Sequence, residues 1–118
     1  MKLYAVRIFV RDWDSCCAFY RDTLQLRERF RDNDIGWAEY DIGGPCLGLE
    51  RAETTDQESA ALVGRFVGAS LQVPDIDAAC RAMQARGVPF TTPPEKQPWG
   101  GKLAHFADPD GNVLTLIG

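Results

Sequence analysis

The side chains with the most chemical potential in this 118-residue chain are a single histidine, His105, and carboxylates that include Glu39 and Glu50. Because His105 is the only histidine, a site built on two or more histidines of one chain is excluded. One imidazole with two carboxylates is a legitimate ligand set for a transition metal. A lone imidazole can also act as a general acid or base, because its pKa lies near neutral pH. The residue types leave both chemistries open.

The four cysteines have no spacing typical of a reactive or metal-binding site. Cys16 and Cys17 are adjacent, whereas Cys46 and Cys80 stand alone, so the chain has no CxxC pair and no disulfide-rich pattern. A nucleophilic thiol needs a histidine or another cation held close, and the sequence indicates none. We expect buried, reduced thiols that pack as small hydrophobic groups, as in a cytoplasmic protein.

Composition narrows the class of protein. The chain has 13 Lys and Arg against 17 Asp and Glu, a net charge of −4, and 45% hydrophobic residues. The hydrophobic fraction excludes intrinsic disorder, and the acidic balance argues against a nucleic-acid partner. No apolar run approaches the ~20 residues of a membrane helix. Lys2 and Arg7 interrupt the N-terminal apolar stretch, unlike a signal peptide. We expect one cytoplasmic domain over 1–118, without a membrane partner.

Hydrophobic periodicity indicates the elements that position these side chains. Asp12 and Asp14 offer N-cap oxygens ahead of a helical repeat, and Gly43-Gly44-Pro45 is a hairpin signal. The pattern predicts a strand at 3–10, an amphipathic helix at 13–23, a short strand near 26–30, a turn at 32–34, strands at 35–42 and 46–51, and a polar linker at 52–64 with a short helical turn.

The second half of the chain repeats the first. The segment Val10 to Asp14 recurs as Val73 to Asp77, and Gly87 then ends a second helix. Ala38-Glu39-Tyr40 is answered by Ala104-His105-Phe106, and Leu47-Gly48-Leu49 by Leu114-Thr115-Leu116. Each half therefore has the order strand, helix and three strands. The repeat predicts module 1 at about 1–52, a linker at about 53–65 and module 2 at about 66–118.

Two βαβββ units with Asp108-Pro-Asp-Gly-Asn112 in the last hairpin resemble the vicinal oxygen chelate superfamily, the group of glyoxalase I, extradiol dioxygenases, fosfomycin-resistance enzymes and bleomycin-resistance proteins. The segment 18–24 resembles that family's first helix, and 98–112 its last hairpin. The resemblance implies an α+β fold in which two tandem βαβββ modules form a curved mixed β-sheet cup with the helices packed outside. It also implies a small-molecule ligand and a homodimer.

Strand alternation predicts which side chains face the cup, because a shift of one residue exchanges the two faces. The helix-facing set is Tyr4, Val6, Ile8, Val10, Ala38, Tyr40, Leu47, Leu49, Val67, Ala69, Leu71, Val73, Ala104, Phe106, Leu114 and Leu116. The cup-facing set is Ala5, Arg7, Phe9, Trp37, Glu39, Cys46, Gly48, Glu50, Gly68, Ser70, Gln72, Leu103, His105, Val113, Thr115 and Ile117.

The positions at which the resemblance places metal ligands lack suitable donors. Metal-using relatives take a His or Gln and a Glu from each unit, and the corresponding residues here are Ala5, Gly48, Gly68 and Thr115. Alanine and glycine carry no donor atom, and a neutral hydroxyl is a poor ligand. We predict no metal and no cofactor at the usual site. An off-register site formed by Glu39, Glu50 and His105 stays open.

The predicted ligand-binding residues are Arg7, Phe9, Trp37, Glu39, Glu50, Gln72, Trp99 and His105. Strand alternation places Trp37 on the cup-facing side. Trp99 lies in a Pro/Gly-rich loop, 93–101, which we expect near the cup mouth. Aromatic faces suit a flat or cationic ligand. Arg7 should either meet Glu50 or Glu39 or bind an anionic group of a ligand. The acidic chain as a whole favours a basic or neutral ligand.

We therefore expect a metal-free small-molecule binding protein that resembles the bleomycin-resistance branch and sequesters an antibiotic or another aromatic ligand. One alternative is a lyase, isomerase or dioxygenase-like enzyme that uses displaced metal ligands, or acid and base groups among Glu39, Glu50 and His105. Another is a partner-binding domain whose cup is filled by its own side chains. The sequence leaves open whether the modules pair within one chain or are exchanged between subunits.

Overall fold

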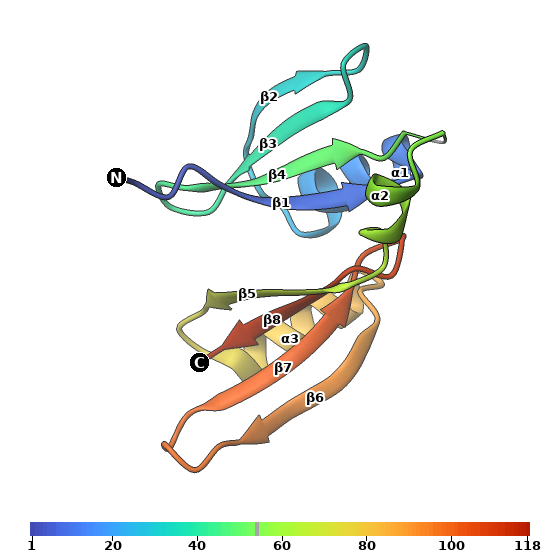
Figure 1. Cartoon of the computed structure of the whole chain (residues 1–118). Coiled ribbons are helices and arrows are strands. Elements are labelled where there is room, and N and C mark those ends of the chain that lie inside the picture. Colours follow the sequence, from blue (N-terminus) through green and yellow to red (C-terminus); the bar gives the residue numbers. More distant parts are fainter. Residues whose placement is uncertain (54) are drawn as a thin grey trace.

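The computed structural model describes residues 1–53 and 55–118. Its elements are β1 (Ala5–Val10), α1 (Trp13–Ala18), the π-helical η1 (Phe19–Thr23), β2 (Glu28–Asp32), β3 (Trp37–Asp41), β4 (Cys46–Arg51), α2 (Gln57–Ala61), β5 (Phe66–Gln72), α3 (Ile76–Ala85), β6 (Phe90–Lys96), β7 (Lys102–Ala107) and β8 (Val113–Ile117). They form two four-stranded sheets, in the orders β1-β4-β3-β2 and β5-β8-β7-β6 (Figure 1). β1 runs parallel to β4 and β5 parallel to β8, and the other pairs are antiparallel. The predicted α+β fold of two βαβββ units is confirmed.

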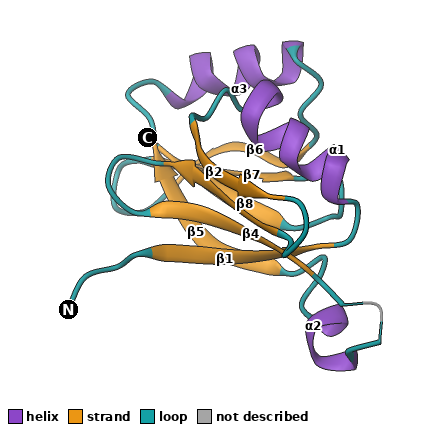
Figure 2. Ribbon diagram, turned by 90° about the horizontal axis from the view of Figure 1, so that it is seen from above, coloured by secondary structure: helices purple, strands orange, loops and turns teal. Residues whose placement is uncertain are grey.

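The two sheets share one side on which the helices pack. Seen from above, α1 and α3 lie together on one side of the strands, and α2 lies toward the opposite side (Figure 2). We call the face of both sheets that is turned away from α1 and α3 the open face; Figure 1 looks onto it. It corresponds to the predicted cup.

The repeated aspartates begin the two helices in the same way. The carboxylate of Asp12 accepts a hydrogen bond from the backbone N–H of Ser15 at 3.4 Å, and that of Asp75 accepts one from Ala78 at 3.0 Å. These are N-cap contacts, which satisfy a backbone donor that the helix leaves unpaired. α3 ends just before Gly87, whose φ of +90° is the left-handed conformation that favours glycine. The structure therefore confirms the helix boundaries predicted from the second repeat.

One hydrophobic core joins both modules. Strand residues of helix-facing parity are buried on both sheets, and those in the core are Ile8, Val10, Ala38, Tyr40, Leu47, Leu49, Ala104, Phe106, Leu114 and Leu116. They pack with the inner faces of α1 and α3, among them Cys16 and Cys80. The alternation predicted for β3, β4, β7 and β8 is therefore confirmed.

Two local predictions are wrong. Tyr4 does not face the helix: it precedes β1, is exposed, and its hydroxyl donates to Glu39 on the open face at 2.8 Å. Strand alternation does not extend to a residue outside the strand. Pro93 and Pro94 do not lie in a loop, because β6 continues through them to Lys96. β6 is an edge strand, where a residue without an N–H can be tolerated.

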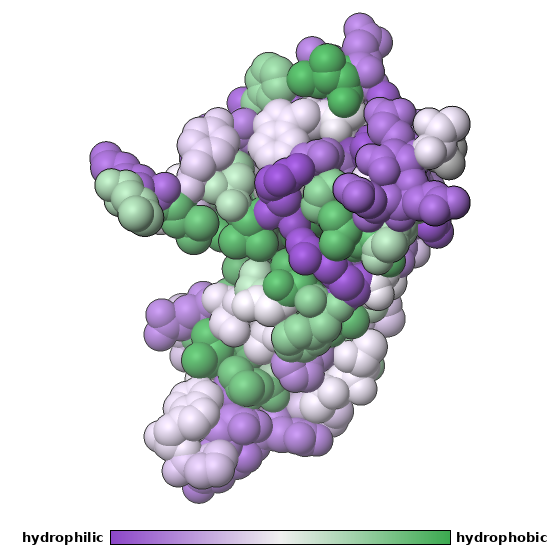
Figure 3. Space-filling view, viewed as in Figure 1, coloured by the Kyte–Doolittle hydropathy of each residue, from purple (hydrophilic) through white to green (hydrophobic). Residues whose placement is uncertain are grey.

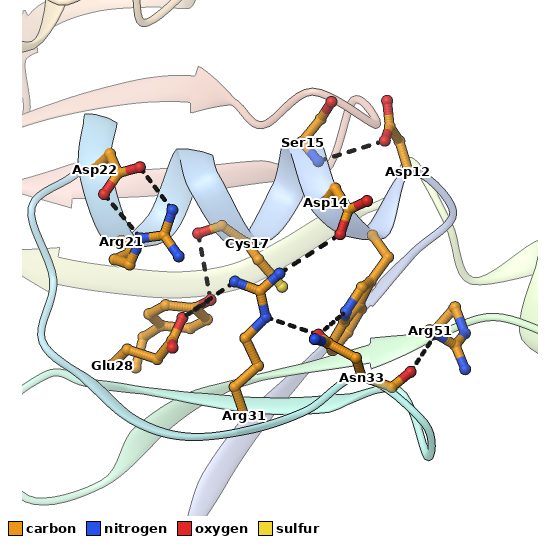
Figure 4. Close-up of polar contacts among 12 residues, drawn as sticks. Asp12, Asp14, Ser15, Cys17, Arg21, Asp22, Glu28, Arg31, Asn33 and Arg51 are labelled. Atoms are coloured by element: carbon orange, nitrogen blue, oxygen red, sulfur yellow. Dashed lines mark hydrogen bonds and ion pairs between the residues drawn. The ribbon is translucent and has the colours of Figure 1, made fainter.

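A polar network fastens α1 to β2 on the helix side of the first sheet (Figure 4). The guanidinium of Arg31 donates to the side-chain oxygen of Asn33 at 2.8 Å and lies 3.5 Å from Asp14 and 3.8 Å from Glu28. Asn33 also accepts from the indole N–H of Trp13 at 2.9 Å. These charges serve the packing of a helix on a strand, and they lie away from the open face.

The Asp-Pro-Asp-Gly-Asn turn joins the two modules. The buried carboxylate of Asp108 accepts hydrogen bonds from the Tyr20 hydroxyl at 2.8 Å and from the Asn112 side-chain amide at 2.9 Å. The same amide donates to the carbonyl of Phe9 in β1 at 3.0 Å, and its oxygen accepts from the backbone N–H of Gly64 at 2.9 Å. We call Tyr20, Asp108 and Asn112 the intermodule clamp. It connects the first strand and helix to the last hairpin.

The four cysteines are buried free thiols, and burial raises the pKa of each of them. For Cys16, the carboxylates of Asp108 and Asp110 raise the pKa further. Because the thiolate is the reactive form, we expect no thiol of the folded protein to react with 5,5′-dithiobis(2-nitrobenzoate) within minutes at pH 8. All four should react in denaturant. An Arg81→Cys variant, with its thiol on the exposed surface of α3, is the positive control. Rapid reaction of a native thiol in the unmodified protein would contradict this prediction.

Among the described residues, no helix has the length and apolar character needed to cross a membrane.

Candidate functional site

The open face of the first sheet brings together five of the predicted ligand-binding residues. In one row across three strands, Phe9 of β1 pairs with Glu50 of β4, which pairs with Trp37 of β3. In the next row, Gly48 of β4 lies between Arg7 and Glu39. Residues paired across strands share a face of the sheet. These side chains therefore form one contiguous surface.

The indole of Trp37 occupies the space above Gly48. A β-carbon built on Gly48 would lie 2.2 Å from the Cη2 atom of the Trp37 ring, far inside van der Waals contact. The indole N–H donates to the Glu39 carboxylate at 2.9 Å, which fixes the orientation of the ring. Glycine at this position therefore allows an aromatic ring to lie directly against the backbone of β4.

Glu39 is the centre of a polar group around that ring. In addition to Trp37, its carboxylate accepts a hydrogen bond from the Tyr4 hydroxyl and lies 3.6 Å from the guanidinium of Arg29. The Trp37 N–H, the Tyr4 hydroxyl and the charge of Arg29 lower the pKa of the Glu39 carboxyl below its ordinary value of 4.5. Glu39 is therefore ionised at neutral pH and is an acceptor, not a proton donor.

Replacing Glu39 with glutamine should destabilise the protein by about 1–2 kcal/mol at neutral pH, since it weakens charge-assisted hydrogen bonds. A lowered pKa in the folded state adds stability above the unfolded value and loses it as the pH falls through the folded value. The difference between the native protein and Glu39→Gln should therefore be full above pH 4.5 and shrink below it. Urea denaturation across this pH range measures the difference. A gap that is independent of pH would contradict the assignment.

Arg7 and Glu50 form an ion pair on the same surface. The Nη2 atom of Arg7 lies 2.8 Å from a carboxylate oxygen of Glu50, and Nε donates to the same oxygen at 3.0 Å. Arg7 therefore takes the first of the two roles predicted for it. Its guanidinium also lies 5.2 Å from the centre of the Phe9 ring, within cation–π distance.

The remaining predicted residues lie elsewhere. His105 of β7 is on the second sheet, where its Nδ1 lies 2.9 Å from the Thr115 hydroxyl and its ring meets the edge of Phe66. Trp99 is 59% exposed at the tip of the β6–β7 hairpin, and its ring packs over Gly101. Gln72, at the end of β5, lines a different hollow.

That hollow is an apolar cleft of about 630 Å³ between the two modules. Most of its lining is aliphatic, including Leu3, Val6, Leu26 and Leu71, with Gln72 among the polar residues. The space-filling view of the open face shows hydrophobic residues gathered where the modules meet (Figure 3). Of the eight predicted ligand-binding residues, only Gln72 lines this cleft in the part of the chain that the structure describes.

The residues present do not fit the metal site of the resemblance. Ala5, Gly48 and Gly68 supply no donor atom, the Trp37 ring fills the space above Gly48, and the Thr115 hydroxyl is hydrogen-bonded to His105. Within 1–53 and 55–118, no three His, Cys, Asp or Glu side chains are grouped so that they could hold a metal ion. The alternative set of Glu39, Glu50 and His105 is not assembled either.

Sequence reasoning missed three residues of this surface, Tyr4, Arg29 and Phe66. Tyr4 was placed on the wrong face, and Arg29 lies where the β2–β3 register shifts between Glu28 and Phe30, so alternation could not place it. Phe66 begins β5 and packs against His105. The pairing of β5 with β8 would have located Phe66, because Phe66 pairs with Val113, which belongs to the cup-facing set. Phe66 and Tyr4 are largely exposed, as is Phe30 in β2.

Comparisons with known proteins agree with this architecture. The family model described as "Glyoxalase/Bleomycin resistance protein/Dioxygenase superfamily" matches residues 2–116. A bleomycin resistance protein of Klebsiella pneumoniae is 31% identical, over 91% of this chain and 84% of its own. A solved superfamily member from Sphaerobacter thermophilus is 30% identical with a TM-score of 0.81, over 99% of this chain and 96% of its own. TnmS3, described as an antibiotic binding protein from a Streptomyces species, is 28% identical with a TM-score of 0.78, over 98% and 93%.

Proposed function

Since the chain belongs to the glyoxalase/bleomycin resistance protein/dioxygenase superfamily, we propose that it is a metal-free protein that binds and sequesters an aromatic small molecule, such as an antibiotic, on its open face. The Trp37 ring above Gly48 carries this proposal. Metal-using relatives have a glutamate at the position of Gly48. Here the Trp37 ring occupies the space above that position, and an aromatic surface of this kind suits stacking with a planar ligand. The description of TnmS3 as an antibiotic binding protein supports the same function.

The surface around Trp37 supplies the other features of a ligand site. Tyr4, Arg29 and Glu39 provide a donor and charges beside the platform, and Arg7, which lies over the Phe9 ring, continues the surface toward the second sheet. Ligand sites are mostly apolar surfaces with a few placed polar groups. His105 and Trp99 remain proposed ligand contacts, although Trp99 packs on its own hairpin.

A second copy of the chain would enclose this site. Ligand sites bury most of the surface of a small molecule, whereas the open face of one chain exposes Tyr4, Phe30 and Phe66. Exposed aromatic side chains on one face are typical of an interaction surface. We therefore include a homodimer in the proposal. We also propose that the protein acts in the cytoplasm, where its four free thiols would stay reduced. Light scattering on the purified protein measures the oligomeric state, and a monomer would remove this part of the proposal.

Isothermal titration with planar aromatic antibiotics tests the binding function. We expect the native protein to bind at least one of them, and Trp37→Leu to weaken that binding at least ten-fold, because the stacking platform is lost. Trp99→Leu, the same substitution at a proposed outer contact whose ring packs on its own hairpin, should cost less, at most two- to three-fold. Equal binding by Trp37→Leu and the native protein would contradict the assigned platform.

Elemental analysis of the protein tests the metal-free part. We expect no stoichiometric transition metal, because the donor atoms are lacking. A stoichiometric metal that is lost in His105→Ala would favour the enzyme alternative.

A further inference from the structure

Arg65, at the end of the linker, reaches onto the open face of the first module. It lies immediately before β5, and its Nη2 atom donates to the carbonyl of Arg7 in β1 at 2.9 Å. Its guanidinium carbon is 6.0 Å from the centre of the Phe9 ring, which Arg7 approaches at 5.2 Å. Two guanidinium groups, one from β1 and one from the linker, therefore lie against one aromatic ring.

The charges of these two arginines are balanced differently. Arg7 is paired with Glu50 at 2.8 Å. Among the described residues, by contrast, no carboxylate lies within 4.0 Å of the Arg65 guanidinium. The Nε atom of Arg65 is buried without a hydrogen-bond partner in the same part of the chain. A partly buried cation without a counter-charge is costly, and the chain's 17 acidic residues make this arrangement unexpected on composition alone.

The backbone that carries this side chain is held in place by the last hairpin. The backbone N–H of Arg65 donates to the Asn112 side chain at 3.3 Å, and its carbonyl accepts from the N–H of Val113 at 2.9 Å. The Phe9 ring is 6% exposed and gives the guanidinium a fixed surface to lie on. A guanidinium held in one position binds oxyanions such as carboxylates with little reorganisation.

From this geometry we infer that Arg65, supported by Phe9 and Arg7, binds an anionic group of the ligand, so that the natural ligand is an aromatic carboxylate or sulfonate. This inference rests on the proposed function and specifies the ligand class at the same open face. The net charge of −4 does not oppose it, because charges more than about 10 Å away are screened by salt. The expectation of a basic or neutral ligand came from net charge, whereas the local charge at Arg65 is positive.

Three probes with one ring system test the inference: 2-naphthoate, neutral 2-naphthamide and cationic 2-naphthylmethylamine. By isothermal titration we expect the native protein to bind the anion at least ten-fold more tightly than the amide, and the cation most weakly. Arg65→Gln should remove the preference for the anion and leave amide binding within two-fold. Arg65→Lys should retain part of the preference. Arg81→Gln on the exposed surface of α3 makes the same charge change and should alter neither affinity.

The outcomes separate the two proposals. If the native protein binds naphthamide as tightly as naphthoate, the anion subsite is wrong and the aromatic-binding function stands. If Arg65→Gln keeps the full preference for naphthoate, Arg65 is not the anion-binding residue. If none of the naphthalene probes binds, the result counts against both proposals. Thermal unfolding of Arg65→Gln verifies that it is folded before its affinities are compared.

Discussion

Asn112→Ala should lower the free energy of unfolding by about 3–5 kcal/mol, the largest effect that we expect from one side chain of this protein. The substitution removes a donor to Asp108, a donor to the Phe9 carbonyl and the acceptor for Gly64. Each buried polar group left without a partner costs about 1–3 kcal/mol. Urea denaturation followed by circular dichroism measures the loss, and we expect one cooperative transition in both proteins because both modules share a core.

Asn33→Ala is the matched control for this prediction. It also deletes an asparagine that accepts two hydrogen bonds, from Trp13 and Arg31, but Asn33 is exposed and its partners lie within the first module. We expect a loss of about 1 kcal/mol. If Asn112→Ala and Asn33→Ala were equally stable, the turn would not act as a clamp between modules.

The pH dependence of Asn112→Ala gives a further check on the clamp. Burial raises the pKa of Asp108 above its ordinary value of 3.8, and the hydrogen bonds from Asn112 and Tyr20 act in the opposite direction. Without Asn112, the folded-state pKa of Asp108 should rise further. A raised carboxyl pKa means that stability is greatest below the unfolded value and is lost as the pH rises through the folded value. The deficit of the variant should therefore be larger at neutral pH than below 3.8.

Gly48→Ala should destabilise the protein by about 1–3 kcal/mol and abolish binding of aromatic ligands, because the added methyl group and the Trp37 ring claim the same space. The backbone of β4 is fixed on both sides by β1 and β3, so the ring has to move. The displaced indole would lose its hydrogen bond to Glu39. Denaturation and isothermal titration measure the two effects on the same protein.

A double-mutant cycle separates crowding from other effects of Gly48→Ala. In a Trp37→Leu background the side chain above Gly48 is smaller, so the additional cost of Gly48→Ala should fall to less than half. Ligand binding should stay weak, since the platform is lost in either case. If the losses of stability from Gly48→Ala and Trp37→Leu were additive, the two residues would not compete for space, which would contradict the contact in the structure.

Much of the fold could be predicted because the sequence repeat determined both the order of the helices and strands and which strand residues face the helices. Leu47-Gly48-Leu49 and Leu114-Thr115-Leu116 lie on equivalent strands, and the two N-cap aspartates begin equivalent helices. The family match supports the same conclusion. The division into a single domain with modules at about 1–52 and 66–118 stays a prediction, for which the cooperative transition expected above is the test.

The candidate site was harder to predict from the sequence than the fold. Alternation placed Trp37 and Gly48 on one face, but it could not show that the ring covers the glycine, because this depends on a side-chain rotamer. The register shift in β2 hid Arg29, and the linker hid Arg65, since strand parity does not apply there. Pairings across long sequence separations, such as Arg65 with Arg7, leave no local pattern.

The intermodule clamp also constrains how the protein is made. The bond from Asn112 to the Phe9 carbonyl spans 103 residues, and the bond from Tyr20 to Asp108 spans 88. A chain leaving the ribosome from its N-terminus therefore presents β1 and α1 long before their partners are synthesised. The first half has the element order of a complete unit, yet its Tyr20 hydroxyl and Phe9 carbonyl find these partners only in the second half. The first half of the chain therefore depends on the second for its final buried hydrogen bonds, and folding is complete only after the last hairpin has been synthesised.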